Sequence, residues 1–284
     1  GDMVRADILS DFTDRMSVAG FESKAFMPSY GMAEATLALS FAAPESEIVV
    51  DVVDRAKMKS TGRAVPASEI DKMNQPEKVR SFVACGAVMP DHEMVVRDDH
   101  GNELGEREIG HVLVKGPSLM AGYYMNEEAT GAIMGEDGFM DTGDMGYMLD
   151  GQIVLTGRAK DLILHNGRNI WPQDIEWAAE QLDDLRDGDV AAFGIEDAEG
   201  EEQVTVLVQC RFQDEARREA LRYEVSKIVH RTAGVECDVM LVPPRSLPFT
   251  SSGKLSRAGA KAKFLSGEIV PIFAPQPEAL AAVG

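Results

Sequence analysis

Cysteine, histidine and long apolar runs are all scarce in this sequence, and each shortage excludes a class of protein. The three cysteines and five histidines among 284 residues stand singly, without CxxC, HxxxH or HExxH spacing. We therefore expect free, buried thiols in a reducing compartment and no structural metal site. No stretch approaches about 18 apolar residues and no basic-then-apolar leader opens the sequence, so we expect a cytoplasmic protein without stable membrane insertion.

Basic residues are outnumbered as well. Lysine and arginine total 28 against 48 acidic residues, which gives a net charge of −20. A chain of this charge repels a nucleic-acid backbone and an anionic membrane, so we expect neither as a partner. The hydrophobic content of 44% is that of a globular protein, and the length allows two domains that each bury a core.

The first candidate site is the run Tyr30-Gly31-Met32-Ala33-Glu34. Apolar spacing predicts a helix over residues 6–16 before it, and residues 35–39 after it are expected to form a second helix. A glycine turn that opens a helix favours anions at the free N–H groups. The Tyr30 ring can stack on a base, and Glu34 offers a hard oxygen ligand for Mg²⁺. By itself the pattern is more typical of a structural turn.

Residues 42–80 show no clear period and carry prolines, which indicates an irregular surface connection. Short apolar runs over residues 82–86, 94–96 and 111–114 are separated by turn signals. Strands at this spacing predict a small β-barrel subdomain.

Residues 141–176 hold the densest set of motifs. Asp141-Thr142-Gly143-Asp144 predicts a tight turn, in which an Asp carboxylate can accept two hydrogen bonds from a vicinal diol. Asp150-Gly151 between two apolar runs predicts a hairpin. The second strand leads into the charged run Gly157-Arg158-Ala159-Lys160-Asp161. Ordinary hairpins with surface charges are the alternative for each motif taken alone.

The remainder of the chain predicts a compact α/β module with its boundary near Lys160. The expected elements are a helix capped by Asp174, strands at 190–195 and 204–208, a helix at 215–232 and a strand at 238–242.

The last motif is Pro248-Phe249-Thr250-Ser251-Ser252-Gly253-Lys254. Proline, hydroxyl residues and glycine fix a loop that presents one ammonium group. Such a cation can neutralise charge on a carboxylate that attacks a phosphate. A polar surface loop is the alternative, and the spacing of the glycines excludes a P-loop.

In their order and spacing, four motifs resemble those of the adenylate-forming superfamily of acyl-CoA synthetases, luciferase and nonribosomal-peptide adenylation domains. The motifs are YGMAE, DTGD, GRAKD with GRN, and PFTSSGK. PQDIE after GRN, and YGMAE with Ala33 at its fourth position followed by ATL, look closest to the fatty acyl-AMP ligase branch. Ala33 departs from the general pattern, because many members have there a Thr that contacts the α-phosphate. The run 116–124 resembles a glycine-rich turn of the family.

The resemblance implies a multi-domain α/β fold. Residues 1–159 would be the remainder of a large N-terminal domain, with the β-barrel-like subdomain at 82–159. Residues 160–284 would be a small, mobile C-terminal α/β domain. Residues 45–80 are a candidate for the added segment that fatty acyl-AMP ligases carry soon after YGxAE.

The resemblance also implies a role for each matched residue. Tyr30 would border the adenine in an AMP site that includes Gly31, Met32 and Ala33, and Glu34 would bind Mg²⁺. Asp144 would hold both ribose hydroxyls with help from Arg158. Lys160 would be the hinge between the domains, and Lys254 would bridge the substrate carboxylate and the α-phosphate.

The implied reaction joins a fatty acid and ATP into acyl-AMP and pyrophosphate, and then passes the acyl group to the thiol of an acyl carrier protein or CoA. The family rotates its C-terminal domain between these steps, so Lys254 would serve only the first. Nothing matches the family's upstream phosphate loop, so we expect an inactive C-terminal portion that lacks its N-terminal half. A fatty acyl-CoA ligase and a non-catalytic carrier-docking module formed by residues 161–265 are the alternatives.

Overall fold

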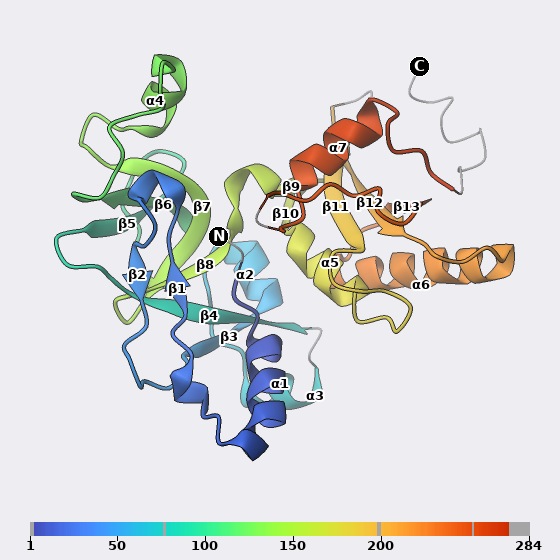
Figure 1. Ribbon diagram of the computed structural model, residues 1–284, viewed down its shortest axis with the longest axis horizontal. Coiled ribbons are helices and arrows are strands. Elements are labelled where there is room, and N and C mark those ends of the chain that lie inside the picture. Colours follow the sequence, from blue (N-terminus) through green and yellow to red (C-terminus); the bar gives the residue numbers. More distant parts are fainter. Residues whose placement is uncertain (1–2, 76–77, 198–199, 252, 273–284) are drawn as a thin grey trace. The chain divides into compact units, whose positions relative to one another are not determined.

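The computed structural model describes residues 3–75, 78–197, 200–251 and 253–272 of the chain. It divides into two compact units, Gly1–Lys160 and Asp161–Gly284, which are described in turn (Figure 1). Both units combine helices with sheets, so the predicted α/β class is confirmed. Ser252 of the last motif and the proline-containing tail beyond residue 272 lie outside the described residues.

Unit 1 is built on an eight-stranded sheet with the order β1-β2-β4-β8-β7-β6-β5, in which β3 also pairs with β4. The strands are β1 (Ser29–Tyr30), β2 (Ser40–Phe41), β3 (Val50–Asp54), β4 (Val79–Val88), β5 (Glu93–Arg97), β6 (Gly110–Lys115), β7 (Met140–Leu149) and β8 (Gln152–Arg158). Adjacent residues Ile153 and Val154 of β8 belong to different core clusters, so the sheet is buried on both faces.

The β-barrel predicted over residues 82–159 is not closed. A barrel requires its two edge strands to pair with each other. Within the described residues the strand path ends at β1 and at β5, and no pairing joins them. The two-residue β1 is too short to form a seam along the five residues of β5, so the sheet stays open.

Three other predicted elements need correction. Residues 42–80 are not irregular throughout, since they contain β3, α2 (Arg55–Thr61) and α3 (Glu69–Asn74). The helix expected over residues 35–39 is only a 3₁₀ turn, Ala33–Ala35, because Thr36 with φ 67° ends the helical path. The helix expected to be capped by Asp174 begins earlier, at Pro172, because proline suits a first helical position.

The run Asp141–Asp144 is a bulge within β7 rather than a free turn. Register runs from Leu113↔Asp141 to His111↔Met145, so Thr142, Gly143 and Asp144 lie opposite Val112 alone. Gly143, with φ 70°, takes up the extra length.

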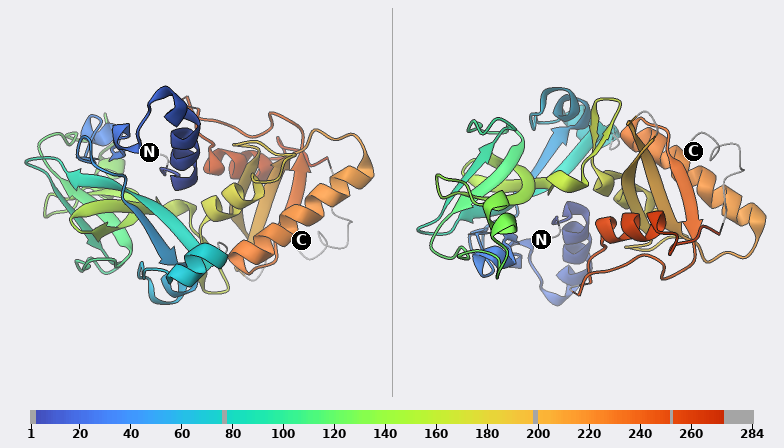
Figure 2. Two further views of the ribbon diagram at one scale, coloured as in Figure 1. Left: turned by 90° about the horizontal axis from the view of Figure 1, so that it is seen from below. Right: turned by 90° about the horizontal axis from the view of Figure 1, so that it is seen from above.

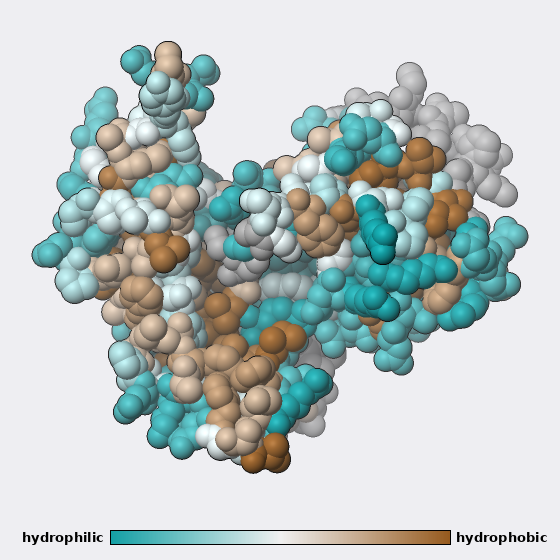
Figure 3. All heavy atoms as spheres, in the orientation of Figure 1, coloured by the Kyte–Doolittle hydropathy of each residue, from teal (hydrophilic) through white to brown (hydrophobic). Residues whose placement is uncertain are grey.

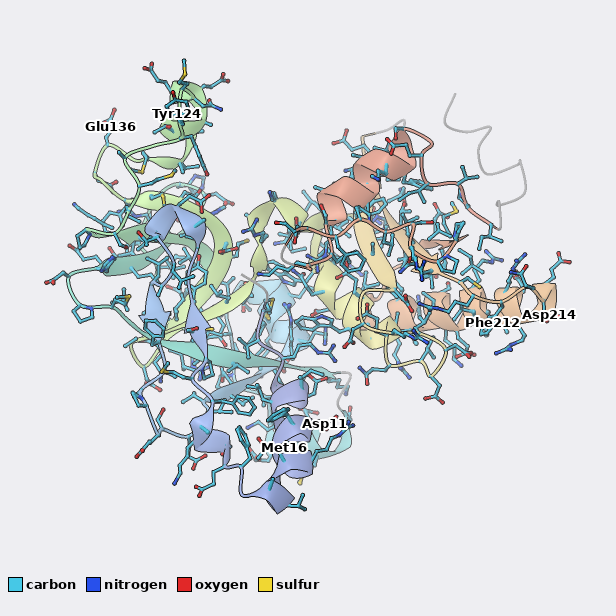
Figure 4. The ribbon with its side chains drawn as sticks, viewed as in Figure 1. Asp11, Met16, Tyr124, Glu136, Phe212 and Asp214 are labelled. Carbon is cyan, nitrogen blue, oxygen red and sulfur yellow. The ribbon has the colours of Figure 1, made fainter. Side chains whose placement is uncertain are left out.

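Helix α1 (Ala6–Met16) forms as predicted, yet none of its residues is buried. Phe12 packs edge-on against Phe21 and Phe26 with ring centroids 5.1 and 5.6 Å away. Figure 3 shows apolar surface over this part of unit 1, and Met16 lies 41% exposed on the same helix (Figure 4). The apolar stripe predicted from the sequence therefore remains partly exposed.

Unit 2 contains a three-stranded sheet, β11-β12-β13, with helices on both faces, and a separate two-stranded sheet, β9-β10 (Figures 1 and 2). It consists of β9 (Ile163–His165), β10 (Arg168–Ile170), α5 (Pro172–Ala179), β11 (Val190–Glu196), β12 (Glu202–Gln209), α6 (Glu215–Ala233), β13 (Asp238–Val242) and α7 (Arg257–Leu265). Along β11, Val190 and Ala192 pack with α5 and α6, whereas Ala191 and Phe193 pack with α7. This alternation is the two-residue period of a strand buried on both sides.

Local caps fix where the long helix α6 starts. Asp214 accepts a hydrogen bond from the Arg217 backbone N–H at 2.9 Å, and the Arg217 guanidinium lies 3.7 Å from the centroid of the Phe212 ring (Figure 4). No described helix of either unit is long and apolar enough to cross a membrane.

Candidate adenylate-binding site

The candidate site of unit 1 is organised around the carboxylate of Asp144, which is only 5% exposed. Its Oδ2 accepts a hydrogen bond from the Tyr30 hydroxyl at 2.6 Å. Its Oδ1 accepts one from Nε of Arg158 at 3.2 Å. These three residues come from β7, β1 and β8, and the sheet brings together positions up to 114 apart in sequence.

The bulge in β7 aims Asp144 inward. The Thr142 hydroxyl donates to the carbonyl oxygen of Val112 at 2.7 Å and accepts from the Asp144 backbone N–H at 3.1 Å. The Asp141 carboxylate accepts from the Gly143 backbone N–H at 2.8 Å. These bonds satisfy the backbone groups that the bulge removes from the ladder, so the conformation of Asp144 is fixed before any ligand arrives.

Tyr30 acts through its hydroxyl in this arrangement. The side chain is 3% exposed and belongs to a core cluster, so its ring packs within the protein. Burial raises the pKa of Tyr30 well above its usual value, and the charge of Asp144 adds to that effect. The hydroxyl is therefore protonated at neutral pH and remains a donor to Asp144.

Gly31, Met32 and Ala33 form the turn that follows Tyr30. An added Cβ at Gly31 would lie 1.8 Å from the carbonyl oxygen of Leu37, so only glycine permits this close approach. The end of the turn is tied down by the Thr36 hydroxyl, which donates to the carbonyl oxygen of Ser118 at 3.2 Å. The glycine-rich loop over residues 116–124 thus anchors the turn.

Glu34 lies in the same turn and contacts that loop. Its Oε1 accepts from the Tyr123 hydroxyl at 2.9 Å, and its backbone oxygen accepts from the Met120 N–H at 2.7 Å. Among the described residues, Glu34 is part of no group of three or more acidic, histidine or cysteine side chains. A single carboxylate suits Mg²⁺ that takes its other ligands from phosphates and water, so Glu34 fits a Mg²⁺–nucleotide and not a protein-only metal site.

Lys254 belongs to unit 2 and lies in a tight loop. The Thr250 N–H donates to the Lys254 carbonyl oxygen at 2.7 Å, and the Thr250 hydroxyl accepts from the Lys254 N–H at 3.1 Å. Gly253 takes φ 81°, which favours glycine. Thr250 and Lys254 are therefore held together by two hydrogen bonds that involve the Lys254 backbone. Lys160, in the 3₁₀ turn Ala159–Asp161, is the last residue of unit 1.

Three residues were given no role from the sequence. Thr142 and Tyr123 lie within recognised motifs and support the site of unit 1, whereas Arg257 lies in unit 2 and follows Lys254 by three positions. Tyr123 had a signal in the resemblance of its loop to a glycine-rich turn of the family. Arg257 had none, because its partners lie 81 and 96 positions away.

Comparison of the sequence and the structure with known proteins identifies the family of this chain. Residues 1–124 match the family model described as AMP-binding enzyme. A putative acyl-CoA synthetase from Caulobacter vibrioides is 48% identical over 268 residues, covering 94% of this chain and 46% of that protein. A medium-chain-fatty-acid–acyl-carrier-protein ligase from Moorena producens is 31% identical, again with 94% and 46% covered. A solved fatty acyl-adenylate ligase, from a study of the E. coli and L. pneumophila enzymes, superposes with TM-score 0.84 at 39% identity, covering 94% of this chain and 46% of the other.

The chain therefore belongs to the AMP-binding, adenylate-forming superfamily, and the resemblance drawn from its four motifs is confirmed. Within that superfamily its relatives are acyl-CoA synthetases and fatty acyl-AMP ligases. The chain spans about half the length of the curated relatives it matches.

Proposed function

We propose that the complete protein activates a fatty acid by adenylation, with Asp144 as the receptor of the AMP ribose. The observation that carries this proposal is the buried carboxylate held by Tyr30 and Arg158. Each carboxylate oxygen can accept more than one hydrogen bond, so both retain capacity for a vicinal diol. The fixed position of Asp144 lowers the entropy cost of ordering the ribose.

The remaining roles follow from the positions around Asp144. Gly31, Met32 and Ala33 would line the AMP site, where Gly31 lets the backbone pass close to the segment 37–38. Glu34 would hold Mg²⁺ through the oxygen that Tyr123 leaves open. Bound Mg²⁺ would neutralise phosphate charge during attack by the fatty acid carboxylate.

Lys254 would supply the second positive charge. Its ammonium would pair with the attacking carboxylate and the α-phosphate, where negative charge accumulates as pyrophosphate leaves. We propose Lys160 as the hinge about which unit 2 turns after this step. In the second step the thiol of an acceptor attacks the acyl carbon, AMP leaves with the former carboxylate oxygen, and the thioester forms.

We propose an acyl carrier protein as the thiol donor. The support is the Moorena producens relative, whose name states acyl-carrier-protein ligation, together with the fatty acyl-adenylate ligase structure. CoA is the alternative acceptor, favoured by the name of the Caulobacter vibrioides relative. A thiol competition assay with both acceptors distinguishes them by which thioester accumulates.

We further propose that residues 1–284 do not catalyse adenylation by themselves. The support is that they correspond to about half of each relative and contain no match to the family's phosphate loop. Rapid acyl-AMP formation by the isolated chain would contradict this.

The test of the proposed function is ATP–pyrophosphate exchange with a panel of fatty acids, in the complete protein. We expect exchange that falls at least about 100-fold in Lys254→Ala, as expected when a preorganised charge is removed from the transition state. Lys227→Ala is the matched control, because Lys227 is an exposed lysine of unit 2 on α6. Absence of exchange with every acid, combined with retained carrier binding, would instead support the docking-module alternative.

A further inference from the structure

Unit 2 contains a buried charge cluster that the proposed reaction does not use. The guanidinium of Arg257 donates from Nε and Nη2 to the carboxylate of Glu176 at 2.6 to 3.1 Å. Its Nη1 donates to Oδ2 of Asp161 at 3.0 Å. The side chains of Arg257, Asp161 and Glu176 are 18%, 12% and 4% exposed. One cation therefore serves two carboxylates away from water.

The cluster joins distant parts of the chain. Asp161 is the first residue of unit 2, directly after Lys160. Glu176 lies on α5, and its Oε1 also accepts from the Ala192 backbone N–H of β11 at 3.0 Å. Arg257 is the first residue of α7. The start of the unit, helix α5 and the edge strand β11 therefore meet at one side chain of α7.

Arg257 also lies next to the loop that carries Lys254. The loop closes through a bridge between Phe249 and Leu255, and the Ser256 N–H donates to the Pro248 carbonyl oxygen at 3.0 Å. The Ser256 hydroxyl then caps α7 by accepting from the Gly259 N–H at 3.2 Å. A displacement of the first turn of α7 would therefore move the whole loop.

From this geometry we propose that Arg257 is a positioning residue for adenylation. Through Asp161 and Glu176 it fixes the loop of Lys254 relative to the beginning of unit 2. The proposal rests on the proposed function, because it assigns Lys254 to the first step only. Lysine cannot replace this arginine fully, because a single ammonium cannot reproduce the planar fork that serves Glu176 and Asp161 together.

The first test measures the two half-reactions of the complete protein separately. In Arg257→Met we expect kcat for ATP–pyrophosphate exchange to fall about 100-fold, the cost typical of a misplaced catalytic group. The KM for ATP should change by less than about threefold, since uniform binding is retained. Transfer from supplied acyl-AMP to the thiol acceptor should also stay within about threefold, because Lys254 would not serve that step. Arg257→Lys should recover part of the exchange activity.

The control is Arg222→Met on α6. Arg222 pairs with Glu219 on the same helix at 2.7 Å and its side chain is 39% exposed, so its loss should leave both half-reactions unchanged. Equal losses of exchange and transfer in Arg257→Met would assign it a purely structural role and overturn the proposal. Unchanged exchange in the folded variant would overturn it as well.

A second test needs no activity. In amide hydrogen exchange of the 284-residue chain, Arg257→Met should lower the protection of Gly253 and Lys254 about tenfold, while that of Val206 in β12 is retained. Loss of protection at all three amides would indicate general unfolding and reject the proposal. If the unaltered complete protein shows no pyrophosphate exchange, both the proposed function and the role of Arg257 are rejected. If that protein does show exchange, but Arg257→Met does not lower exchange more than thiol transfer, only the role of Arg257 is rejected.

Discussion

Replacement of Gly31 by alanine tests the turn after Tyr30 most directly. A Cβ at this position would lie 1.8 Å from the Leu37 carbonyl oxygen and 2.8 Å from Cα of Ala38. Both contacts are with backbone, so no side-chain rotation relieves them. The segment 37–38 would have to move by more than about 1 Å to restore a normal contact.

That movement would spread into the core. The Leu39 N–H donates to the Tyr30 carbonyl oxygen at 2.8 Å, and the Leu39 side chain is fully buried. Overpacking of a well-packed site costs about 1–3 kcal/mol, and the backbone origin of this contact points to the upper end. For a unit of this size, a loss of about 1–3 kcal/mol corresponds to a melting temperature lowered by about 2–12 °C.

The matched control is Gly131→Ala. Gly131 lies in α4 (Glu127–Ile133), and an added Cβ there would meet no heavy atom within 4 Å. Alanine should stabilise this helix by about 0.5–1 kcal/mol through its higher helix propensity. Differential scanning calorimetry of both variants of the chain measures the contrast. An unchanged or raised melting temperature in Gly31→Ala would refute the claim that this position requires glycine.

Two further predictions concern buried polar groups. In Tyr147→Phe, loss of the hydroxyl that donates to Asp51 at 2.6 Å should lower the free energy of unfolding by about 1.5–3 kcal/mol in a urea titration, whereas Tyr223→Phe, at a 65% exposed tyrosine, should change it little. Burial raises the pKa of Glu180 to about 7, although the Gly188 N–H opposes the rise, so the folded state keeps this proton longer than the unfolded state. The contribution of Glu180 to the free energy of unfolding should thus fall between about pH 4.5 and 7, by at most about 3 kcal/mol. The stability of Glu180→Gln relative to the unaltered chain should therefore be higher at pH 8 than at pH 5. Parallel pH profiles of the two proteins would contradict this.

Elements with a strong local signal were predictable from the sequence. The helix Ala6–Met16 and the strand Asp238–Val242 follow the predicted ranges, because apolar spacing alone specifies them. The Asp150-Gly151 hairpin also forms, with both residues at positive φ. Where the signal was a composition rather than a period, as over residues 42–80, the prediction was wrong.

The contacts of the candidate site were not predictable in the same way. No spacing rule links Tyr30 to Asp144, whose hydrogen bond depends on strands β1 and β7 lying in one sheet. The sequence shows only residue type, so it does not indicate that the Tyr30 ring is 3% exposed and packs against strands far along the chain. The place of this ring beside the adenine stays a prediction.

The pairing of Asp144 with Arg158 depends on one extra residue in β8. Beyond the hairpin turn, β7 and β8 pair one residue to one residue from Met148↔Ile153 to Gly146↔Leu155. The next pair is Met145↔Gly157, so one residue of β8 is skipped. Thr156 is therefore the bulged residue, and its carbonyl oxygen accepts from buried Arg80 at 3.1 Å.

Without this bulge the same register would place Gly157 opposite Asp144, because each residue on one strand faces one on the other. Arg158 would then lie opposite Gly143, and its side chain would point to the face of the sheet opposite to that of Asp144. Two bulges thus act together, since the one at Thr142–Asp144 turns the carboxylate inward and the one at Thr156 brings the arginine to it. The turn residues at 150–151 set the register, but the ion pair of the site is determined by where that register is broken.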